Sequence, residues 1–190
     1  MKTDIILSGV GGQGILSIAA IIADAARKQG LNIKQAEVHG MSQRGGDVQS
    51  NLRISSNPIF SDLIEKGHAD VIISMEPMEA LRYAGNLSKE GWIISSSAPF
   101  INIPNYPDVD KVLEELRRRR NVILLDIEAL AKDNDVPRSS NVILLGAAAA
   151  SLGIDREVLK SSLAEFFSAK GEAVVTANMK AFEIGKKLAN

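Results

Sequence analysis

Short apolar runs alternate with longer amphipathic stretches along the first two thirds of the chain. The short runs predict buried strands, at residues 4–8, 31–38, 69–74, 91–97 and 122–126. The stretches between them predict helices, at residues 13–28, 77–84 and 109–120. This alternation indicates a Rossmann-like α/β fold with an open, doubly wound and mostly parallel sheet.

One further strand is predicted to run against the others. Residues 47–55 alternate between apolar positions (Val48, Leu52, Ile54) and polar positions (Gln49, Asn51, Arg53), which is typical of a half-exposed strand. No helix separates this segment from the strand at 31–38, and a parallel neighbour would need such a crossover. We therefore expect one antiparallel strand in the sheet.

Only helices are predicted after the last strand, at residues 127–133, 141–152, 155–168 and 172–188. The segment 142–150 is apolar and rich in alanine, so it could pack very closely against another helix, either within the subunit or across an interface. No linker interrupts the chain. We expect one domain, residues 1–190, whose C-terminal part is all-helical from about residue 127.

Composition excludes several classes of protein. The 190 residues are 45% hydrophobic and carry a net charge of −1, so nothing favours nucleic-acid binding. Asp24 and Arg27 interrupt the best apolar run before it reaches the roughly 18 residues that a membrane span needs. Without a signal-peptide pattern, the chain is expected to be cytoplasmic and not bound to a membrane.

The chain contains no cysteine and only two histidines. Disulfides, a cysteine nucleophile and thiolate ligands for zinc or an iron–sulfur cluster are therefore excluded, and no metal site is expected. Any redox metal that works with this protein must be carried by another chain.

The first candidate site is a glycine loop between the first strand and the first helix. Gly9, Gly11 and Gly14 match G-x-G-x-x-G, directly after Ile5-Ile6-Leu7. Glycines there permit a tight turn, and the free N–H groups at a helix start attract phosphate or carboxylate. Packing between helix and sheet is the alternative reason for these glycines.

A second glycine loop, residues 39–46, follows the second strand. In a parallel sheet both loops would lie at the same edge, as neighbours across the crevice where ligands bind. This loop combines an imidazole, a hydroxyl, an amide, a guanidinium and three glycines: His39, Gly40, Ser42, Gln43, Arg44, Gly45 and Gly46. Arg44 could instead pair with Glu37 or contact a partner subunit.

Two other functions are compatible with these loops. In a free-standing NAD- or FAD-dependent oxidoreductase, Glu37 would hold a ribose hydroxyl, about twenty residues after Gly14. The polar loop after Glu37 and the isolation of Tyr83 and Tyr106 fit hydride chemistry poorly. A non-catalytic binding module is the other alternative.

The two loops together resemble those of a known family. Residues 9–16 (GVGGQGIL) and 37–46 (EVHGMSQRGG) resemble the γ-type domain of the 2-oxoacid:ferredoxin oxidoreductases, and are most similar to the small (beta) subunits that serve indolepyruvate. Weaker similarities continue in order along the chain, at residues 69–70, 76–82, 103–110, 141–147 and 178–182.

This resemblance implies a subunit of an enzyme that oxidatively decarboxylates an aryl pyruvate to an aryl-acetyl-coenzyme A and reduces ferredoxin. It implies a large (alpha) partner subunit that carries thiamine diphosphate and the iron–sulfur clusters, with coenzyme A as co-substrate. The small subunit would bind no cofactor alone, would be inactive alone, and could self-associate when isolated.

With this family in view, the glycine loops are expected to bind coenzyme A, the carboxylate of the 2-oxoacid, or only the partner subunit. Gly11, Gly12, Gln13 and Gly14 would offer backbone donors at the helix start. In the second loop, Arg44 would supply a planar cation suited to carboxylate or phosphate. His39 could donate to a substrate oxygen or move a proton.

Overall fold

The computed structural model describes residues 1–39 and 45–189 and contains a six-stranded sheet. The strands are β1 (Lys2–Val10), β2 (Asn32–His39), β3 (Asp47–Ser55), β4 (Ala69–Ser74), β5 (Leu87–Ser96) and β6 (Val122–Leu125), in the spatial order β2-β3-β1-β4-β5-β6. β3 is antiparallel to β1 and β2, whereas β1, β4, β5 and β6 are mutually parallel. The predicted sheet with one antiparallel strand is confirmed.

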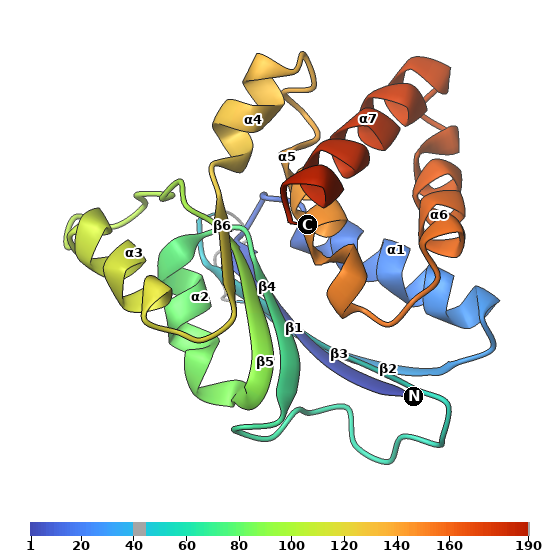
Figure 1. Ribbon diagram of the computed structural model, residues 1–190, viewed down its shortest axis with the longest axis horizontal. Helices are drawn as coiled ribbons and strands as arrows, with labels where there is room; N and C mark the ends of the chain where they lie inside the picture. Colours follow the sequence, from blue (N-terminus) through green and yellow to red (C-terminus); the bar gives the residue numbers. More distant parts are fainter. Residues whose placement is uncertain (40–44, 190) are drawn as a thin grey trace.

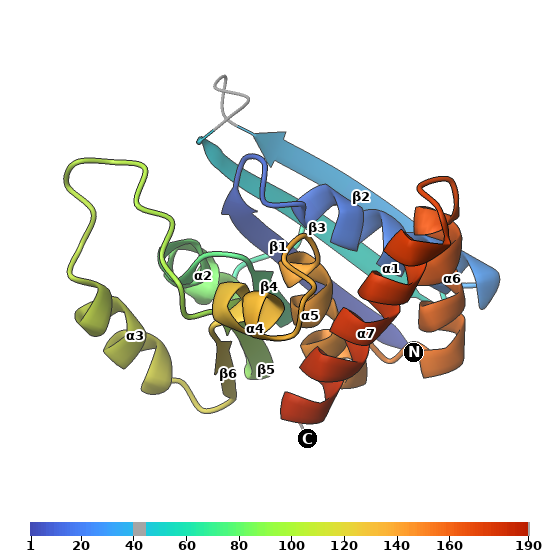
Figure 2. The ribbon, with the colours of Figure 1, turned by 90° about the horizontal axis from the view of Figure 1, so that it is seen from above.

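Helices cover both faces of this sheet (Figure 1, Figure 2). One face carries α1 (Ile15–Lys28), α5 (Ser140–Ala148), α6 (Arg156–Ser168) and α7 (Glu172–Leu188); the other carries α2 (Pro77–Tyr83) and α3 (Val109–Arg117). Helix α4 (Ile127–Asp133) follows β6, and the short 3₁₀ turns η1 (Ala84–Asn86) and η2 (Ala149–Ser151) follow α2 and α5. Thus the all-helical segment after β6 supplies most of one layer.

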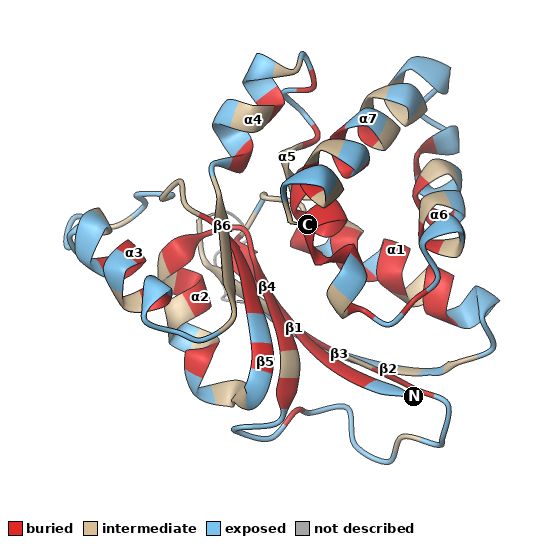
Figure 3. Cartoon of the chain, in the orientation of Figure 1, coloured by how far each residue is buried: buried red, intermediate tan, exposed pale blue. Residues whose placement is uncertain are grey.

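The central strand β1 is buried on both sides, which explains its continuous apolar sequence. Ile5 and Leu7 belong to the larger core beneath α1, α5 and α7, whereas Ile6 belongs to the smaller core beneath α2 and α3. Figure 3 shows the buried residues concentrated on the central strands and on the inner sides of the helices.

The alternating pattern of β3 sets which side chains reach which face. Leu52 and Ile54 pack into the core beneath α1, as their positions predicted. The opposite side of β3 carries Asn51 and Arg53 and is covered by the segment 56–68 instead of a helix, so Asn51 is only 4% exposed. This polar side is therefore less exposed than the half-exposed strand predicted from the sequence.

Arg53 ties that segment to a buried charge. Its guanidinium makes two hydrogen bonds to the Asp4 carboxylate, at 2.8 and 3.0 Å, and Asp4 is 1% exposed. Nη1 of Arg53 also donates to the carbonyl oxygens of Ser61 and Leu63, both at 3.1 Å. One side chain thus neutralises a buried carboxylate and holds the backbone of the covering segment.

Helices α5 and α7 lie in direct backbone contact. A Cβ atom on Gly146 would overlap the carbonyl oxygen of Phe182, and one on Gly185 would overlap that of Ile143. The small, apolar sequence of residues 142–150 therefore serves close packing inside the subunit, which was one of the two arrangements predicted for it.

No helix within residues 1–39 and 45–189 combines the length and the apolar character needed to cross a bilayer.

Candidate functional site

The first glycine loop lies where β1 ends and α1 begins, as predicted. Gly14 is the N-cap residue of α1 and has φ of 85°, in the left-handed region that glycine adopts without strain. A Cβ at this position would lie 2.6 Å from Nδ2 of Asn141, the second residue of α5. Two constraints therefore require glycine here: the backbone conformation and the close approach of α5.

Two of the four predicted backbone donors already have partners within the protein. The amide of Gly11 donates to the carbonyl oxygen of Gly46 at 2.9 Å, and that of Gln13 donates to Val10 at 3.1 Å. Among the described residues, the amides of Gly12 and Gly14 have no such partner. Of the four amides expected from the sequence, those of Gly12 and Gly14 therefore remain as donors for a ligand.

The side chain of Gln13 also stabilises the loop. Its Oε1 accepts a hydrogen bond from the amide of Val10 at 2.7 Å, and its Nε2 donates to the carbonyl oxygen of Met75 at 3.4 Å. Gln13 therefore joins the end of β1 to the end of β4. Gly9 lies within β1, where a Cβ would crowd this same Gln13 oxygen at 2.9 Å.

A cavity of about 530 Å³ opens beside this loop, within the range of small-molecule sites. It is lined by Gly12, Gln13, Gly14, Met75, Ser96, Ala98, Pro99, Phe100, Glu128, Arg138, Ser140 and Asn141. These residues come from the carboxyl ends of β1, β4 and β5, from the segment that follows β5, from α4 and from the segment that enters α5. The cavity thus occupies the sheet edge where the sequence predicted a ligand.

Two helix N-termini meet at this cavity. Neither α1 nor α5 has a side-chain cap or an acidic residue in its first turn. Asn141, in the first turn of α5, donates from Nδ2 to the carbonyl oxygen of Gly14 at 3.3 Å and so joins the two helix starts. With the guanidinium of Arg138 alongside, the partial positive charges of both helices favour an anion, although Glu128 also lines the cavity.

Gly45 and Gly46 of the second glycine loop lie beside the first loop at the same edge of the sheet. β1 and β2 are parallel and are connected by α1, but they are not neighbours in the sheet. β3 lies between β1 and β2, and the turn from β2 to β3 carries this loop. Gly46 accepts from Gly11, and Gly45 accepts from Nδ2 of Asn102. Gly40, Ser42, Gln43 and Arg44 lie outside the described residues, as does the side chain of His39.

A third segment, residues 97–108, forms the apolar wall of the cavity. It is held by the carboxylate of Glu76, which is 1% exposed and accepts from the hydroxyl of Tyr106 and the amide of Phe100. Glu76 also caps α2 by accepting from the amide of Glu79 at 2.8 Å. Burial and the Glu76 carboxylate raise the pKa of Tyr106, so its hydroxyl remains a donor.

A second group of carboxylates lies where β3 begins and α2 packs. The hydroxyl of Tyr83 donates to Oδ2 of Asp47 at 2.8 Å, and Arg82 makes two hydrogen bonds to Glu79. Burial, followed by the Asp47 carboxylate, raises the pKa of Tyr83. Tyr83 and Tyr106, isolated in the sequence, are thus both paired with carboxylates in the structure.

The dinucleotide alternative does not fit this topology. In that mode the acidic residue ends the strand adjacent to β1, but here β3 separates β2 from β1. Glu37 is exposed at the outer strand of the sheet and accepts a hydrogen bond from Gln35 at 2.6 Å. It does not line the cavity beside the glycine loop.

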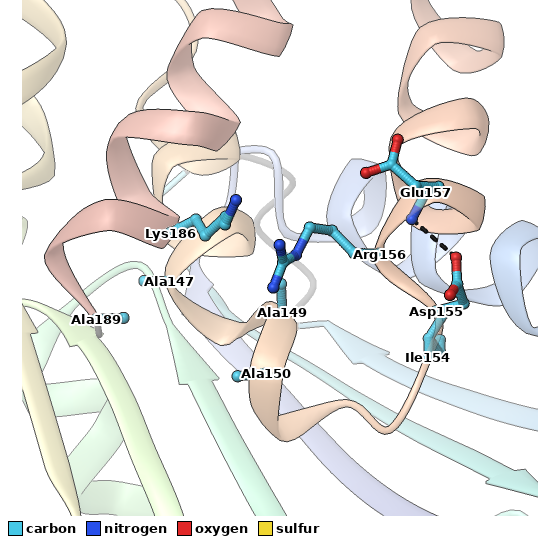
Figure 4. A pocket seen from close by; sticks show the side chains of 10 residues that line it. Ala147, Ala149, Ala150, Ile154, Asp155, Arg156, Glu157, Lys186 and Ala189 are labelled. Atoms are coloured by element: carbon cyan, nitrogen blue, oxygen red, sulfur yellow. Dashed lines mark hydrogen bonds between the residues drawn. The ribbon is translucent and has the colours of Figure 1, made fainter.

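Another cavity, of about 490 Å³, lies between α5, α6 and α7, away from both glycine loops. Arg156 and Lys186 reach toward one another across it (Figure 4). Asp155 and Glu157 are its two acidic lining residues. Asp155 already accepts from the amides of Glu157 and Val158, at 2.9 and 3.1 Å, and Lys186 pairs with Glu183 at 3.2 Å. Its floor of small residues follows from the close packing of α5 and α7.

Sequence reasoning missed several residues of the main cavity, above all Arg138 and Asn141. The run Ser139-Ser140-Asn141 after Pro137 is a helix-start signal, so the position of α5 could be predicted. That its start meets Gly14, 127 residues earlier, depends on tertiary packing. Within the described ranges, no group of three or more histidine, aspartate or glutamate side chains is arranged to hold a metal ion.

Comparisons with known proteins agree with this fold. The family model of pyruvate ferredoxin/flavodoxin oxidoreductase matches residues 4–188. An indolepyruvate oxidoreductase subunit IorB from Archaeoglobus fulgidus is 36% identical, over 97% of this chain and 94% of that protein.

Two solved structures are also similar. The 2-oxoglutarate:ferredoxin oxidoreductase from Magnetococcus marinus, determined with 2-oxoglutarate, coenzyme A and succinyl-CoA bound, has a TM-score of 0.79 at 25% identity; the match covers 99% of this chain but 31% of that longer one. The gamma subunit of a keto/oxoacid ferredoxin oxidoreductase from Geobacter sulfurreducens has a TM-score of 0.70 at 25% identity, over 98% of both chains. The chain therefore belongs to the pyruvate ferredoxin/flavodoxin oxidoreductase family.

Proposed function

We propose that this chain is the small subunit of a 2-oxoacid:ferredoxin oxidoreductase that acts on aryl pyruvates. The complex would oxidatively decarboxylate an aryl pyruvate to an aryl-acetyl-coenzyme A and pass the electrons to ferredoxin. The observation that carries this proposal is the similarity over almost the whole chain to a subunit named for indolepyruvate. The glycine-loop cavity gives the chain a place to contribute to that reaction.

In this proposal the cavity holds an anionic group, either a phosphate of coenzyme A or the carboxylate of the 2-oxoacid. The amides of Gly12 and Gly14, the start of α5 and the guanidinium of Arg138 are the donors that favour an anion. Pro99 and Phe100 would exclude water on the opposite wall. His39 and Arg44 remain candidate contributors from the second loop, on sequence grounds.

The redox groups would belong to a large partner subunit. This chain has no cysteine, so its residues do not fit an iron–sulfur cluster, and it shows no thiamine-binding motif. Thiamine diphosphate and the clusters would therefore be carried by the partner, and ferredoxin would meet this chain only indirectly. The chain alone would be inactive in the overall reaction.

Co-purification tests the assembly. A tagged form of this chain, recovered from its native cell extract, is expected to bring a larger, cysteine-rich chain with it. The eluate should reduce a viologen dye only when both an aryl pyruvate and coenzyme A are present. Recovery of the chain alone, inactive and binding NAD(H) in a thermal-shift assay, would overturn the proposal.

Replacing Arg138 with alanine tests the cavity. A hydrogen bond to a charged group contributes about 1.5–3 kcal/mol, so we expect KM for the anion bound there to rise roughly 10- to 150-fold. The variant would be assembled with the normal large subunit and assayed with coenzyme A and the 2-oxoacid varied separately. Whichever KM rises identifies the anion.

Arg156→Ala is the matched control, because it removes a guanidinium from the cavity between α5, α6 and α7. It should leave both KM values unchanged. If Arg138→Ala also left both KM values and kcat unchanged, the cavity would not be an anion site of the enzyme.

A further inference from the structure

The carboxylate of Glu76 is buried at the junction between the cavity and α2. Glu76 is 1% exposed and is the N-cap residue of α2. It directly follows Met75, which lines the cavity after the end of β4. Within the described ranges, the lining residues do not include Glu76 itself. Any effect of Glu76 on a ligand must therefore pass through the residues that it holds.

Both oxygens of this carboxylate accept hydrogen bonds. Oε2 accepts from the amide of Glu79 at 2.8 Å. Oε1 accepts from the amide of Phe100 at 3.4 Å and from the hydroxyl of Tyr106. All three partners are donors, whereas a glutamine side chain has one acceptor oxygen beside two N–H donors. A carboxylate at this position therefore satisfies both backbone amides, which a side-chain amide cannot do.

The backbone of Glu76 is fixed from the side of the first glycine loop. Oγ of Ser74 donates to the carbonyl oxygen of Glu76 at 2.7 Å, and Oγ of Ser8 donates to Oγ of Ser74 at 2.9 Å. The two serines are register partners on β1 and β4, and both are fully buried. The amide of Met75 donates to the carbonyl oxygen of Ser8 at 2.9 Å. Glu76 thus joins the strand that enters the first glycine loop to the segment 97–108.

The segment held in this way has no helix or strand of its own between β5 and α3. Its ends are joined to β6 and to α3, through Ser97 and Asp108. Between these ends the buried carboxylate binds the segment at two points, Phe100 and Tyr106. Phe100 is 43% exposed, so packing fixes its position only in part. The two hydrogen bonds are therefore expected to set where the apolar wall lies.

The cavity combines donors for an anion with this apolar wall. Amides of the first glycine loop and the guanidinium of Arg138 favour an anion, and the apolar lining includes Met75, Pro99 and Phe100. We propose that Glu76 is a positioning residue that fixes the apolar wall, so that the cavity receives a ligand with an anionic group and a flat apolar group.

Two molecules have this chemistry. An aryl pyruvate joins a carboxylate to an aromatic ring, and coenzyme A joins phosphates to adenine. Glu76 would touch neither, because it acts through Phe100 and its neighbours. The identity of the ligand rests on the proposed function, whereas the positioning by Glu76 does not.

Amide hydrogen exchange of the full chain tests the positioning. Tyr106→Phe keeps the aromatic ring and removes one hydrogen bond to the carboxylate. We expect the amide of Phe100 to exchange roughly 10- to 150-fold faster, the range for loss of a hydrogen bond to a charged group. Glu76→Gln should accelerate exchange at Phe100 or at Glu79, because glutamine cannot accept from both amides.

Tyr83→Phe is the matched control, because Tyr83 donates to the carboxylate of Asp47 at the other end of α2. It should leave exchange at Phe100 unchanged. The amide of Ala129, which donates to Asp126 at the start of α4, reports on general loosening and should keep its rate in every variant. An unchanged rate at Phe100 in Tyr106→Phe, or an equal acceleration at Ala129, would overturn the positioning.

Kinetics of the assembled enzyme test the ligand. Phe100→Ala removes an aromatic contact and should raise one KM roughly 2- to 12-fold, with kcat unchanged. The same KM should rise in Arg138→Ala: that of the aryl pyruvate if its ring meets the wall, or that of coenzyme A if adenine does. Tyr106→Phe should raise this KM too. Combined with Phe100→Ala it should add nothing, because Tyr106 acts through the wall.

The outcomes separate this inference from the proposed function. Additive effects in the double variant, or a KM that rises in Arg138→Ala but not in Phe100→Ala, would overturn the inference alone. If Arg138→Ala changed neither KM, the anion site of the proposed function would fail. Exchange at the Phe100 amide would still decide whether Glu76 positions the wall.

Discussion

Replacing Gly185 with alanine is expected to lower the free energy of unfolding by about 3 kcal/mol, with a corresponding fall in the urea midpoint. The new Cβ would overlap the carbonyl oxygen of Ile143, so α5 and α7 would have to move apart along their contact. Overpacking of a tight core costs about 1–3 kcal/mol and sometimes more, and here the clash is with rigid backbone. The gain in helix propensity, about 1 kcal/mol, is too small to offset it.

Gly85→Ala is the matched control. A Cβ on Gly85 would meet no atom within 4 Å, so its effect should stay within about 0.5 kcal/mol. Gly146→Ala should resemble Gly185→Ala, because it would overlap the carbonyl oxygen of Phe182 in the same contact. The double variant should cost less than the sum, since the first substitution already separates the helices. Equal effects at Gly85 and Gly185 would contradict the close packing.

Arg53→Ala should lower the free energy of unfolding by about as much as Gly185→Ala, for an electrostatic reason. The substitution leaves the carboxylate of Asp4 buried with only Lys2, which is half exposed, as a cationic partner. Removing one member of a buried ion pair costs about 3–5 kcal/mol, and we expect the lower end because Lys2 remains. Urea unfolding followed by circular dichroism measures the loss. Proteolysis within residues 56–68 should also accelerate, because the carbonyl oxygens of Ser61 and Leu63 lose their donor.

A surface arginine provides the comparison. Arg118 pairs with Glu114 and Glu115 on the exposed side of α3, and Arg118→Ala should cost less than about 1 kcal/mol. Adding Asp4→Asn to Arg53→Ala should recover part of the loss, because the buried charge is then removed. Without that recovery, the stabilising role of Arg53 would lie in its contacts with the backbone and not with Asp4.

The sequence was sufficient for most of the fold because each strand and helix carries its own local signal. The apolar run of β1 and the alternation of β3 predicted both their positions and the antiparallel direction of β3. The insertion of β3 between β1 and β2 has no such signal, because it is a choice between strand partners far apart in the sequence. The cover of Arg53 by residues 56–68 was missed for the same reason.

In the candidate site, too, features with a local sequence signal were predicted and features set by distant contacts were missed. The first glycine loop was predicted at the right edge of the sheet, because the glycines of G-x-G-x-x-G serve a local purpose, the tight turn between a strand and a helix. Its donors were overcounted, because Gly11 bonds to Gly46 across a distance that the sequence does not encode. Arg138 was not among the predicted site residues, because the sequence does not show that α5 begins against Gly14.

Among the described residues, two hydrogen bonds join the second glycine loop to its neighbours at this edge: Gly11 donates to Gly46, and Asn102 donates to Gly45. Each of these bonds contributes only about 1 kcal/mol. A molecule that binds one arrangement of the loops more tightly than another can therefore shift the equilibrium toward that arrangement. A ligand that binds to this arrangement and a protein that binds at the same edge would then each change the affinity of the other. By linkage, the factor by which one tightens the other is the same in both directions.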